Sequence, residues 1–201
     1  YITVGNENYV QPVMPANVKT GIIKGMYCYK VSDKKESDIK ANLFGSGSIL
    51  NEVLKAAEIL EEKYNVSCDI WSITSYKQLR HDGLEAERWN MFHPDEKKKT
   101  YIEECLSGTK GVYVAASDYM KTLPDMISKW FPKSLMSLGT EGFGRSESRK
   151  ALRDFFEVDA KHIVLATLYA LLKDKKINID VIQKAIKDLK INPEKISPMM
   201  A

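Results

Sequence analysis

Two glycine-rich segments carry the residue types that most often hold a ligand. The first is FGSGSILNEV, residues 44–53, which places Gly45, Ser46, Gly47 and Ser48 between an apolar run and an amphipathic segment. A Gly/Ser turn that joins a strand to a helix can expose backbone N–H groups to an anion. The segment lacks the G-x-G-x-x-G spacing and the Gly-Lys-Ser/Thr sequence of nucleotide loops. Two interpretations stay open: a tight turn in which Ser48 caps the helix, which we prefer, or an anion site at these four residues.

The second segment is LGTEGFGRSESR, which follows a short apolar run and precedes helical sequence. Glycine is needed where backbone dihedrals or a close approach forbid a side chain. The segment pairs no nucleophile with a base, so we predict a structural corner and not a catalytic loop. The corner consists of Gly139, Gly142, Gly144, Arg145 and Ser146, and Ser146 is expected to cap the next helix. Charge-assisted hydrogen bonds across the corner are expected from Glu141, Arg145 and Arg149.

Histidines and cysteines give no pattern of a metal or nucleophile site. The chain has three histidines (His81, His93 and His162) and three cysteines (Cys28, Cys68 and Cys105), all far apart in sequence. There is no His-x-x-x-His pair, no Cys pair and no G-x-S-x-G elbow. An odd number of widely spaced cysteines indicates reduced thiols rather than a disulfide framework. We therefore expect neither a metal nor a catalytic residue, although folding could still bring a cysteine beside a histidine.

The segment RHDGLEAERWNMFHPDEKKKTYI, residues 80–102, mixes apolar and charged residues at no regular period. It lies where ligand sites at the carboxyl ends of strands would place a functional loop. The alternative is a long connection that folds against a neighbouring domain. Either interpretation implies a contact, and aromatic residues are frequent interface anchors. The candidate interface residues are Trp89, Met91 and Phe92.

The remaining pattern alternates strands and helices. Residues 26–31 and 39–44 flank a polar turn of seven residues, which predicts an antiparallel edge hairpin. A helix is expected over residues 49–64, and another around residues 123–130. Apolar runs predict strands at 68–74, 111–117 and 134–139. After Gly144 the pattern is helical, with Asp159 and Val158 placed as a cap and staple, and Asp180 with Gln183 as a second helix start.

These elements predict an α/β fold of three layers (α/β/α): a mostly parallel sheet of about five strands with one antiparallel edge strand, plus C-terminal helices. Residues 1–20, with two prolines, are expected to be a linker from a preceding domain, and residues 21–201 the domain itself. The chain starts at Tyr1 in extended-looking sequence, from which we expect a piece of a longer polypeptide.

Composition limits the partners. Lys and Arg exceed Asp and Glu by 30 to 27 and are spread along the chain, which argues against nucleic acid. No apolar run reaches the roughly 18–20 residues of a membrane span. With no secretory signal, the expected location is the cytoplasm.

The segments LGTEGFGRSESR, FGSGSIL, WSITSYKQLRHDG and ERWNMFHP, with the ending ISPMMA, together carry a family resemblance. In this order they resemble the C-terminal domain of the decarboxylase component of bacterial homodimeric pyruvate dehydrogenases, which depend on thiamine diphosphate and belong to the transketolase superfamily. The resemblance covers nearly the whole chain. One departure is the lysine run in residues 93–99, where proline-containing sequence is expected in the family.

The resemblance implies an enzyme that decarboxylates pyruvate on thiamine diphosphate and acetylates the lipoyl group of the dihydrolipoyl acetyltransferase component. It implies that cofactor and magnesium lie between the two preceding domains, on a Gly-Asp-Gly motif followed by Asn-Asn. This chain has His81-Asp82-Gly83 but neither motif. We therefore expect no catalytic or cofactor residue here, and a role in packing against preceding domains and a homodimer partner. The alternative function is a stand-alone α/β module that binds an anion or nucleotide at residues 45–48.

Overall fold

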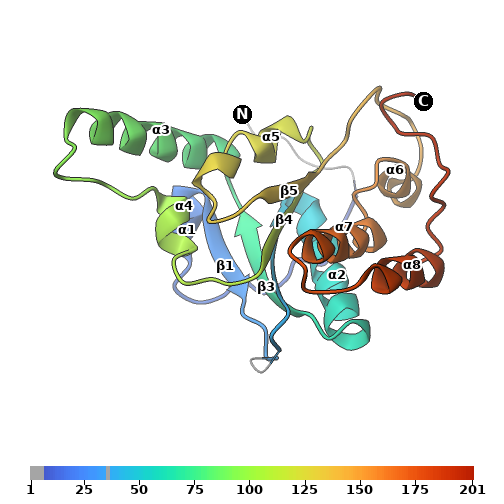
Figure 1. The fold of residues 1–201 in the computed structure, drawn as a ribbon. Helices are drawn as coiled ribbons and strands as arrows, with labels where there is room; N and C mark the ends of the chain where they lie inside the picture. Colours follow the sequence, from blue (N-terminus) through green and yellow to red (C-terminus); the bar gives the residue numbers. More distant parts are fainter. Residues whose placement is uncertain (1–6, 35–36) are drawn as a thin grey trace.

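The computed structural model describes residues 7–34 and 37–201, which form a five-stranded sheet between two layers of helices (Figure 1). The strands are β1 (Met26–Lys30), β2 (Lys40–Ser46), β3 (Ser67–Ile73), β4 (Val112–Ala116) and β5 (Leu135–Leu138). The helices are α1 (Lys19–Lys24), α2 (Leu50–Lys63), α3 (Tyr76–Phe92), α4 (Tyr101–Cys105), α5 (Thr122–Asp125), α6 (Arg149–Phe155), α7 (Ala160–Lys173) and α8 (Ile179–Asp188), with the 3-10 turns η1 (Gly47–Ile49) and η2 (Ser128–Trp130). Within the described ranges, no helix is both long and apolar enough to cross a bilayer.

The strand order is β1-β3-β2-β4-β5, in which β1 alone runs antiparallel to its neighbour. The predicted mixed sheet with one antiparallel edge strand is confirmed. The predicted hairpin is wrong, because β3 lies between β1 and β2. The reason is burial: five consecutive residues of β2 are buried, as a central strand requires, whereas β1 is mostly half-exposed, as suits an edge.

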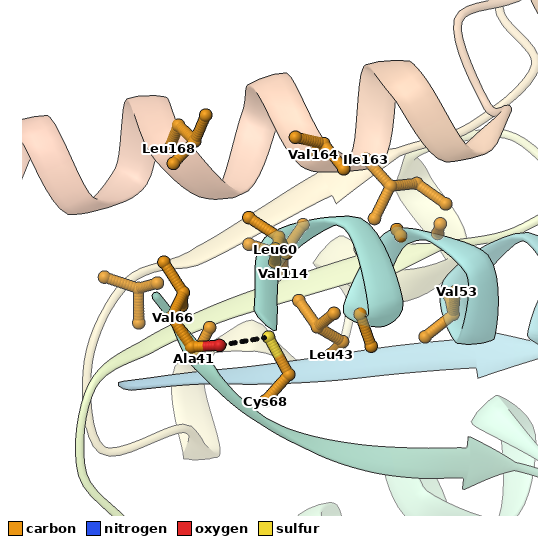
Figure 2. Packing of buried hydrophobic residues seen from close by; sticks show 14 of the residues in the cluster. Ala41, Leu43, Val53, Leu60, Val66, Cys68, Val114, Ile163, Val164 and Leu168 are labelled. Carbon is orange, nitrogen blue, oxygen red and sulfur yellow. Dashed lines mark hydrogen bonds between the residues drawn. The ribbon is translucent and has the colours of Figure 1, made fainter. Parts of the chain in front are cut away.

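One face of the sheet is covered by α2 and α7, with α8 packed against α7 (Figure 1). Figure 2 shows α2 lying on the strands and α7 crossing above it, with Leu60 and Ile163 among the side chains between the layers. The predicted helix over residues 49–64 forms as α2. Cys68 is buried in the same cluster, where its Sγ lies 3.6 Å from the Val66 carbonyl oxygen.

The other face is covered by α3, α4 and the segment around η2, over an aromatic cluster. Phe44 packs edge-on against Phe131 with ring centroids 5.2 Å apart, and stacks on Trp71 at 6.0 Å. The irregular connection predicted at residues 80–102 is wrong over its first half, since α3 is a helix of 17 residues. Its buried residues end at Ala86, so the distal part carries no apolar period, and in Figure 1 it extends away from the sheet.

Helix caps differ from those predicted at three of four positions. Asp159 caps α7 by accepting from the His162 backbone N–H at 3.1 Å, as predicted. Ser148, not Ser146, caps α6. The N-cap of α8 is Asn178, with no side-chain hydrogen bond, so the helix start predicted at Asp180 is wrong. Ser48 does not cap α2 either, because η1 precedes that helix and supplies a turn of its own.

The segment expected to be one helix around residues 123–130 is divided into α5 and η2. Ile127, between the two, is 1% exposed and packs into the aromatic face of the core. Its burial anchors the turn between α5 and η2 against the core.

Replacing Ile163 by Ala tests the packing between α7 and the sheet. Ile163 is 0% exposed, so the cavity left behind should lower the free energy of unfolding by about 2–5 kcal/mol. The control is Ile179, at the start of α8, which is 58% exposed. Ile179→Ala should change the free energy of unfolding by less than about 0.5 kcal/mol. Urea unfolding followed by circular dichroism measures both. An equal decrease in the free energy of unfolding of the two variants would contradict the packing of Ile163 between α7 and the sheet.

Candidate functional site

The carboxyl ends of β2 and β4 form the topological switch point of the sheet. From β2 the chain passes through α2 to β3 on one side, and it returns through α3 and α4 to β4 on the other side of β2. In open α/β sheets, ligand sites form in the crevice outside such a pair of strand ends. Ser46 ends β2, and Ser117 and Asp118 follow β4. The candidate site is therefore located by topology.

Hydroxyl and carboxyl groups connect the two strand ends directly. The Ser46 hydroxyl donates to Ser117 Oγ at 2.9 Å, and the Ser48 hydroxyl donates to Asp118 Oδ2 at 2.9 Å. The Tyr119 backbone N–H also donates to Ser117 Oγ, at 3.2 Å. The two side-chain bonds join residues about seventy positions apart in sequence.

A buried arginine ties this crevice to the helices. Arg153 Nη2 donates to Ser48 Oγ at 3.1 Å and to the Tyr9 hydroxyl at 3.0 Å, while Nη1 lies 3.3 Å from Glu52 Oε1. Glu52 Oε2 accepts from the Ala160 backbone N–H at 3.1 Å, which joins α2 to the start of α7. The side chains of Arg153 and Glu52 are 12% and 9% exposed, so the arginine charge needs the carboxylate, whose Oε1 also lies 3.0 Å from Lys55 Nζ.

Two clefts open on either side of Gly47. The larger, of about 760 Å³, lies between residues 7–12 and the start of α2, and reaches Asp118 and Arg149. Arg149 Nε lies 3.6 Å from a Glu7 carboxylate oxygen, so the N-terminal segment is held at its mouth. The smaller cleft, of about 290 Å³, is lined by Ser46 and the first residues of α3.

The predicted anion site at Gly45, Ser46, Gly47 and Ser48 is divided by this arrangement. Ser48 faces Arg153 and Asp118, whereas Ser46 lines the smaller cleft. Gly45 faces α2, since a Cβ there would lie 2.8 Å from Leu50 Cα. The carboxylate of Asp118 beside Ser48 disfavours an anion on that side. The four residues therefore do not form one loop around a ligand.

The predicted structural corner follows β5. Gly139 approaches the backbone of Tyr119, and a Cβ there would lie 2.5 Å from its carbonyl oxygen. Gly142 has φ +87°, and a Cβ there would lie 2.3 Å from the carbonyl oxygen of Pro198 near the chain end. A Cβ on Gly144 would meet no atom within 4 Å, and the φ of this residue is not positive. The close approaches support the corner at two of its three glycines.

The charged side chains of the corner contact different parts of the chain. The Glu141 carboxylate accepts from the Lys121 backbone N–H at 2.7 Å. The Arg145 guanidinium lies 5.3 Å from the centre of the Phe155 ring, and Arg149 pairs with Glu7. Ser146 is exposed and lies two residues before the capping Ser148, so the corner connects β5 to α6 without a hydroxyl cap at that position.

Of the three candidate interface residues, Trp89 packs within the chain, whereas Met91 and Phe92 are exposed. Trp89 stacks on His93 with ring centroids 3.9 Å apart, and its indole N–H donates to the Glu96 carbonyl at 2.9 Å. Met91 and Phe92 are 70% and 60% exposed at the end of α3. Trp89 therefore organises the loop after α3, and only Met91 and Phe92 of the three offer apolar surface.

None of the three cysteines, all of which lie in the described part of the chain, has a thiol activated as a nucleophile. Burial raises the pKa of Cys28 to about 11, and burial also raises the pKa of Cys68 and Cys105 above the ordinary value. The thiolate, which is the reactive form, is therefore scarce at neutral pH. Sequence reasoning missed Arg153 and Asp118. Asp118 could have been found from its place directly after a buried strand, whereas nothing local marks Arg153, whose partner Glu52 is 101 residues away.

The family model of the transketolase-like TK C-terminal domain matches residues 25–159, which include the whole sheet. The chain belongs to the transketolase-like C-terminal domain family. Among solved structures, transketolase from Leishmania mexicana aligns with a TM-score of 0.54 and 17% identity over 77% of this chain and 19% of that chain. Transketolase from Campylobacter jejuni aligns with a TM-score of 0.51 and 23% identity over 80% of this chain and 20% of that chain. These likenesses show that the fold is shared.

Curated relatives of this transketolase-like domain match it over nearly its whole length. The pyruvate dehydrogenase E1 component of Pseudomonas aeruginosa is 50% identical over 99% of this chain. That of Escherichia coli K12 is 43% identical over 100% of it. The chain spans only 23% and 22% of the length of these two relatives.

Replacing Gly142 by Ala tests the corner of the transketolase-like domain. The backbone strain and the contact with Pro198 should lower the free energy of unfolding by more than about 1 kcal/mol. Gly144→Ala makes the same chemical change where space is open, and it should be neutral or slightly stabilising. Thermal unfolding compares the variants. A neutral Gly142→Ala would show that the corner tolerates a side chain.

Proposed function

We propose that this chain is the C-terminal domain of a pyruvate dehydrogenase E1 component. The observation that carries the proposal is the 50% identity to the Pseudomonas aeruginosa E1 component over 99% of this chain. The same sheet occurs in transketolases at far lower identity, so the fold alone would not separate the two enzymes.

The complete enzyme would decarboxylate pyruvate on thiamine diphosphate and reductively acetylate the lipoyl group of the dihydrolipoyl acetyltransferase component. Its expected location is the cytoplasm. In this proposal residues 1–20 link a preceding domain to the domain at 21–201. The chain contributes no group to the reaction, and its partners are the preceding domains and the second subunit of a homodimer.

The residues present do not fit magnesium and thiamine diphosphate. Among the described residues, the group of His, Cys and carboxylate side chains close enough to hold a metal is Asp154, Asp159 and His162. Its Asp159 already binds the His162 ring at 2.6 Å, and Lys161 pairs with Asp154. Magnesium prefers oxygen ligands and several waters beside phosphates, which this nitrogen-containing, self-paired group does not offer.

Exposed apolar side chains support a role in assembly. Tyr119 and Met120 follow β4, and Phe143 follows β5, with exposed fractions of 65%, 58% and 84%. Because β4 and β5 are parallel, these residues lie beyond the same edge of the sheet. Met91 and Phe92 add apolar surface at the end of α3. Apolar side chains of this size at a surface commonly mark contacts with another domain or subunit.

A domain exchange tests the proposal. In the Pseudomonas aeruginosa E1 component, the matching region is replaced by this chain, and pyruvate decarboxylation and lipoyl acetylation are measured. We expect less than about a tenfold loss of activity, because the contacts to the remaining domains are retained. The matched control carries the equivalent domain of Leishmania mexicana transketolase, which has the fold without the E1 sequence, and it should lose more than about a hundredfold. Equal activity of the two exchanged enzymes, or an inactive but folded first one, would contradict the proposal.

A calorimetric titration tests whether this domain carries any part of the cofactor site. With magnesium present, thiamine diphosphate should give no saturable heat with this chain below about 1 mM, since the sequence contains neither the Gly-Asp-Gly nor the Asn-Asn motif expected to hold the diphosphate. The complete Pseudomonas aeruginosa enzyme serves as the positive control. One-to-one binding at micromolar concentration would show that this domain carries part of the cofactor site.

A stand-alone module that binds an anion or nucleotide at residues 45–48 remains the alternative function. Against it stand the hydrogen bonds that already engage Ser48, and the Asp118 carboxylate beside it. A protein of this kind would function without further domains, so the domain exchange above also separates the two proposals.

A further inference from the structure

Two neighbouring clefts open at the amino ends of the parallel strands, on the edge of the sheet opposite the switch point. Their volumes are about 570 Å³ and about 270 Å³. Both are lined by Lys133 and Asp174, so they meet and form one groove. We call it the amino-edge groove, and the residues that define it are Lys40, Lys110, Lys133, Lys176, Met136 and Ala170. The proposed function gives this groove no role.

The four lysines of the groove come from four separate segments. Lys40 is the first residue of β2, Lys110 lies two residues before β4, and Lys133 lies two residues before β5. Because β2, β4 and β5 are parallel, their amino ends meet at one edge of the sheet. Lys176 follows the end of α7, which packs against β4. The fold therefore concentrates positive charge that is scattered in the sequence.

Positive charge exceeds negative charge on the groove walls. Lys133 Nζ donates to both carboxylate oxygens of Asp174, at 3.1 and 3.0 Å. The other three groove lysines form no ion pair with any residue that the structure describes. The one further carboxylate among the described lining residues is that of Asp38. Uncompensated charge of one sign in a concave surface attracts a partner of opposite charge.

The backbone that carries these lysines is fixed by buried contacts. The Asn42 side chain, on a residue that is 1% exposed, donates to the Lys110 carbonyl oxygen at 3.0 Å. Its Oδ1 accepts from the Trp71 indole N–H at 3.3 Å. Gly111 has φ +99°, and a Cβ there would overlap the Lys40 carbonyl oxygen. Lys40 and Lys110 are thus held next to each other, and a partner has only their side chains to order.

The other end of the groove is apolar and lies between β5 and α7. Met136 and Ala170 are half-buried there, beside Val112, which is 6% exposed. The one aromatic ring among the described lining residues belongs to Tyr113, which is 1% exposed, so the groove has no surface on which a nucleic-acid base could stack. A small inorganic anion would leave the apolar end unused. A protein segment with acidic residues and an apolar side chain fits both ends.

We propose that the amino-edge groove docks an acidic segment of another protein. Carboxylates of the segment pair with Lys40, Lys110 and Lys176, and an apolar side chain of the segment packs on Met136 and Ala170. Charge complementarity across such a contact sets specificity and the rate of association. The ion pairs lie at the surface, where salt screens them, so the complex is a transient one.

Fluorescence anisotropy of a labelled peptide tests the groove. The probe has glutamates on both sides of a central leucine, and the full chain is titrated into it. We expect saturable binding below about 1 mM at about 50 mM salt, and at least about fivefold weaker binding at about 200 mM salt. Lys40→Gln, Lys110→Gln and Lys176→Gln combined should weaken binding at least about tenfold, since each exposed ion pair contributes up to about fivefold. A probe with glycine in place of leucine should bind at least about threefold more weakly, because it buries less apolar surface.

The matched control combines Lys77→Gln, Lys150→Gln and Lys187→Gln. These lysines are exposed on α3, α6 and α8 and line neither cleft, so the control loses the same net charge outside the groove. Its affinity for the probe should change less than about twofold. Absence of saturable binding, equal weakening in the two triple variants, or equal affinity for the two probes would overturn the proposal. Tighter binding of a single-stranded oligonucleotide of the same charge would also overturn it, in favour of nucleic acid. Since binding to this chain is the readout, the outcome is independent of the E1 assignment.

Discussion

The pairing of β2 with β3 on one side and β4 on the other is the constraint on which the rest of this structure depends. It makes β2 the central strand, which is why its side chains are buried on both faces. It also sends the chain in opposite directions from β2, and so creates the switch point at Ser46. The antiparallel strand β1 is then left at the edge, paired with β3 alone.

A second layer of organisation depends on the buried pair of Arg153 and Glu52. Glu52 accepts from the backbone at the start of α7, and Arg153 reaches Ser48 and the N-terminal segment through Tyr9. A buried charge without its partner is costly, so the pair keeps α2, α6 and α7 in one arrangement. The crevice at the strand ends is consequently shaped by residues that never approach one another in sequence.

Local patterns were sufficient for much of the fold. Near neighbours in the chain were enough to predict the helix α2 from its period, the strands β3, β4 and β5 from their apolar runs, and the helix cap at Asp159. Three of the expectations that were wrong share a reason. The adjacency of β1 and β2, the irregular path before Phe92 and the cap at Ser146 depend on which surfaces are covered by distant segments, and propensity carries little of that information.

The sequence by itself determined the α/β class, the single antiparallel strand and the resemblance to the transketolase superfamily, since hydrophobic period and short motifs are local properties. Only the tertiary structure decided the strand order, the division of residues 45–48 between two clefts, and the meeting of Ser46 with Ser117 and of Glu52 with Arg153. The physical reason is the same in each case. These contacts join residues about seventy or more positions apart, and their geometry is set by the packing of the sheet between its helices.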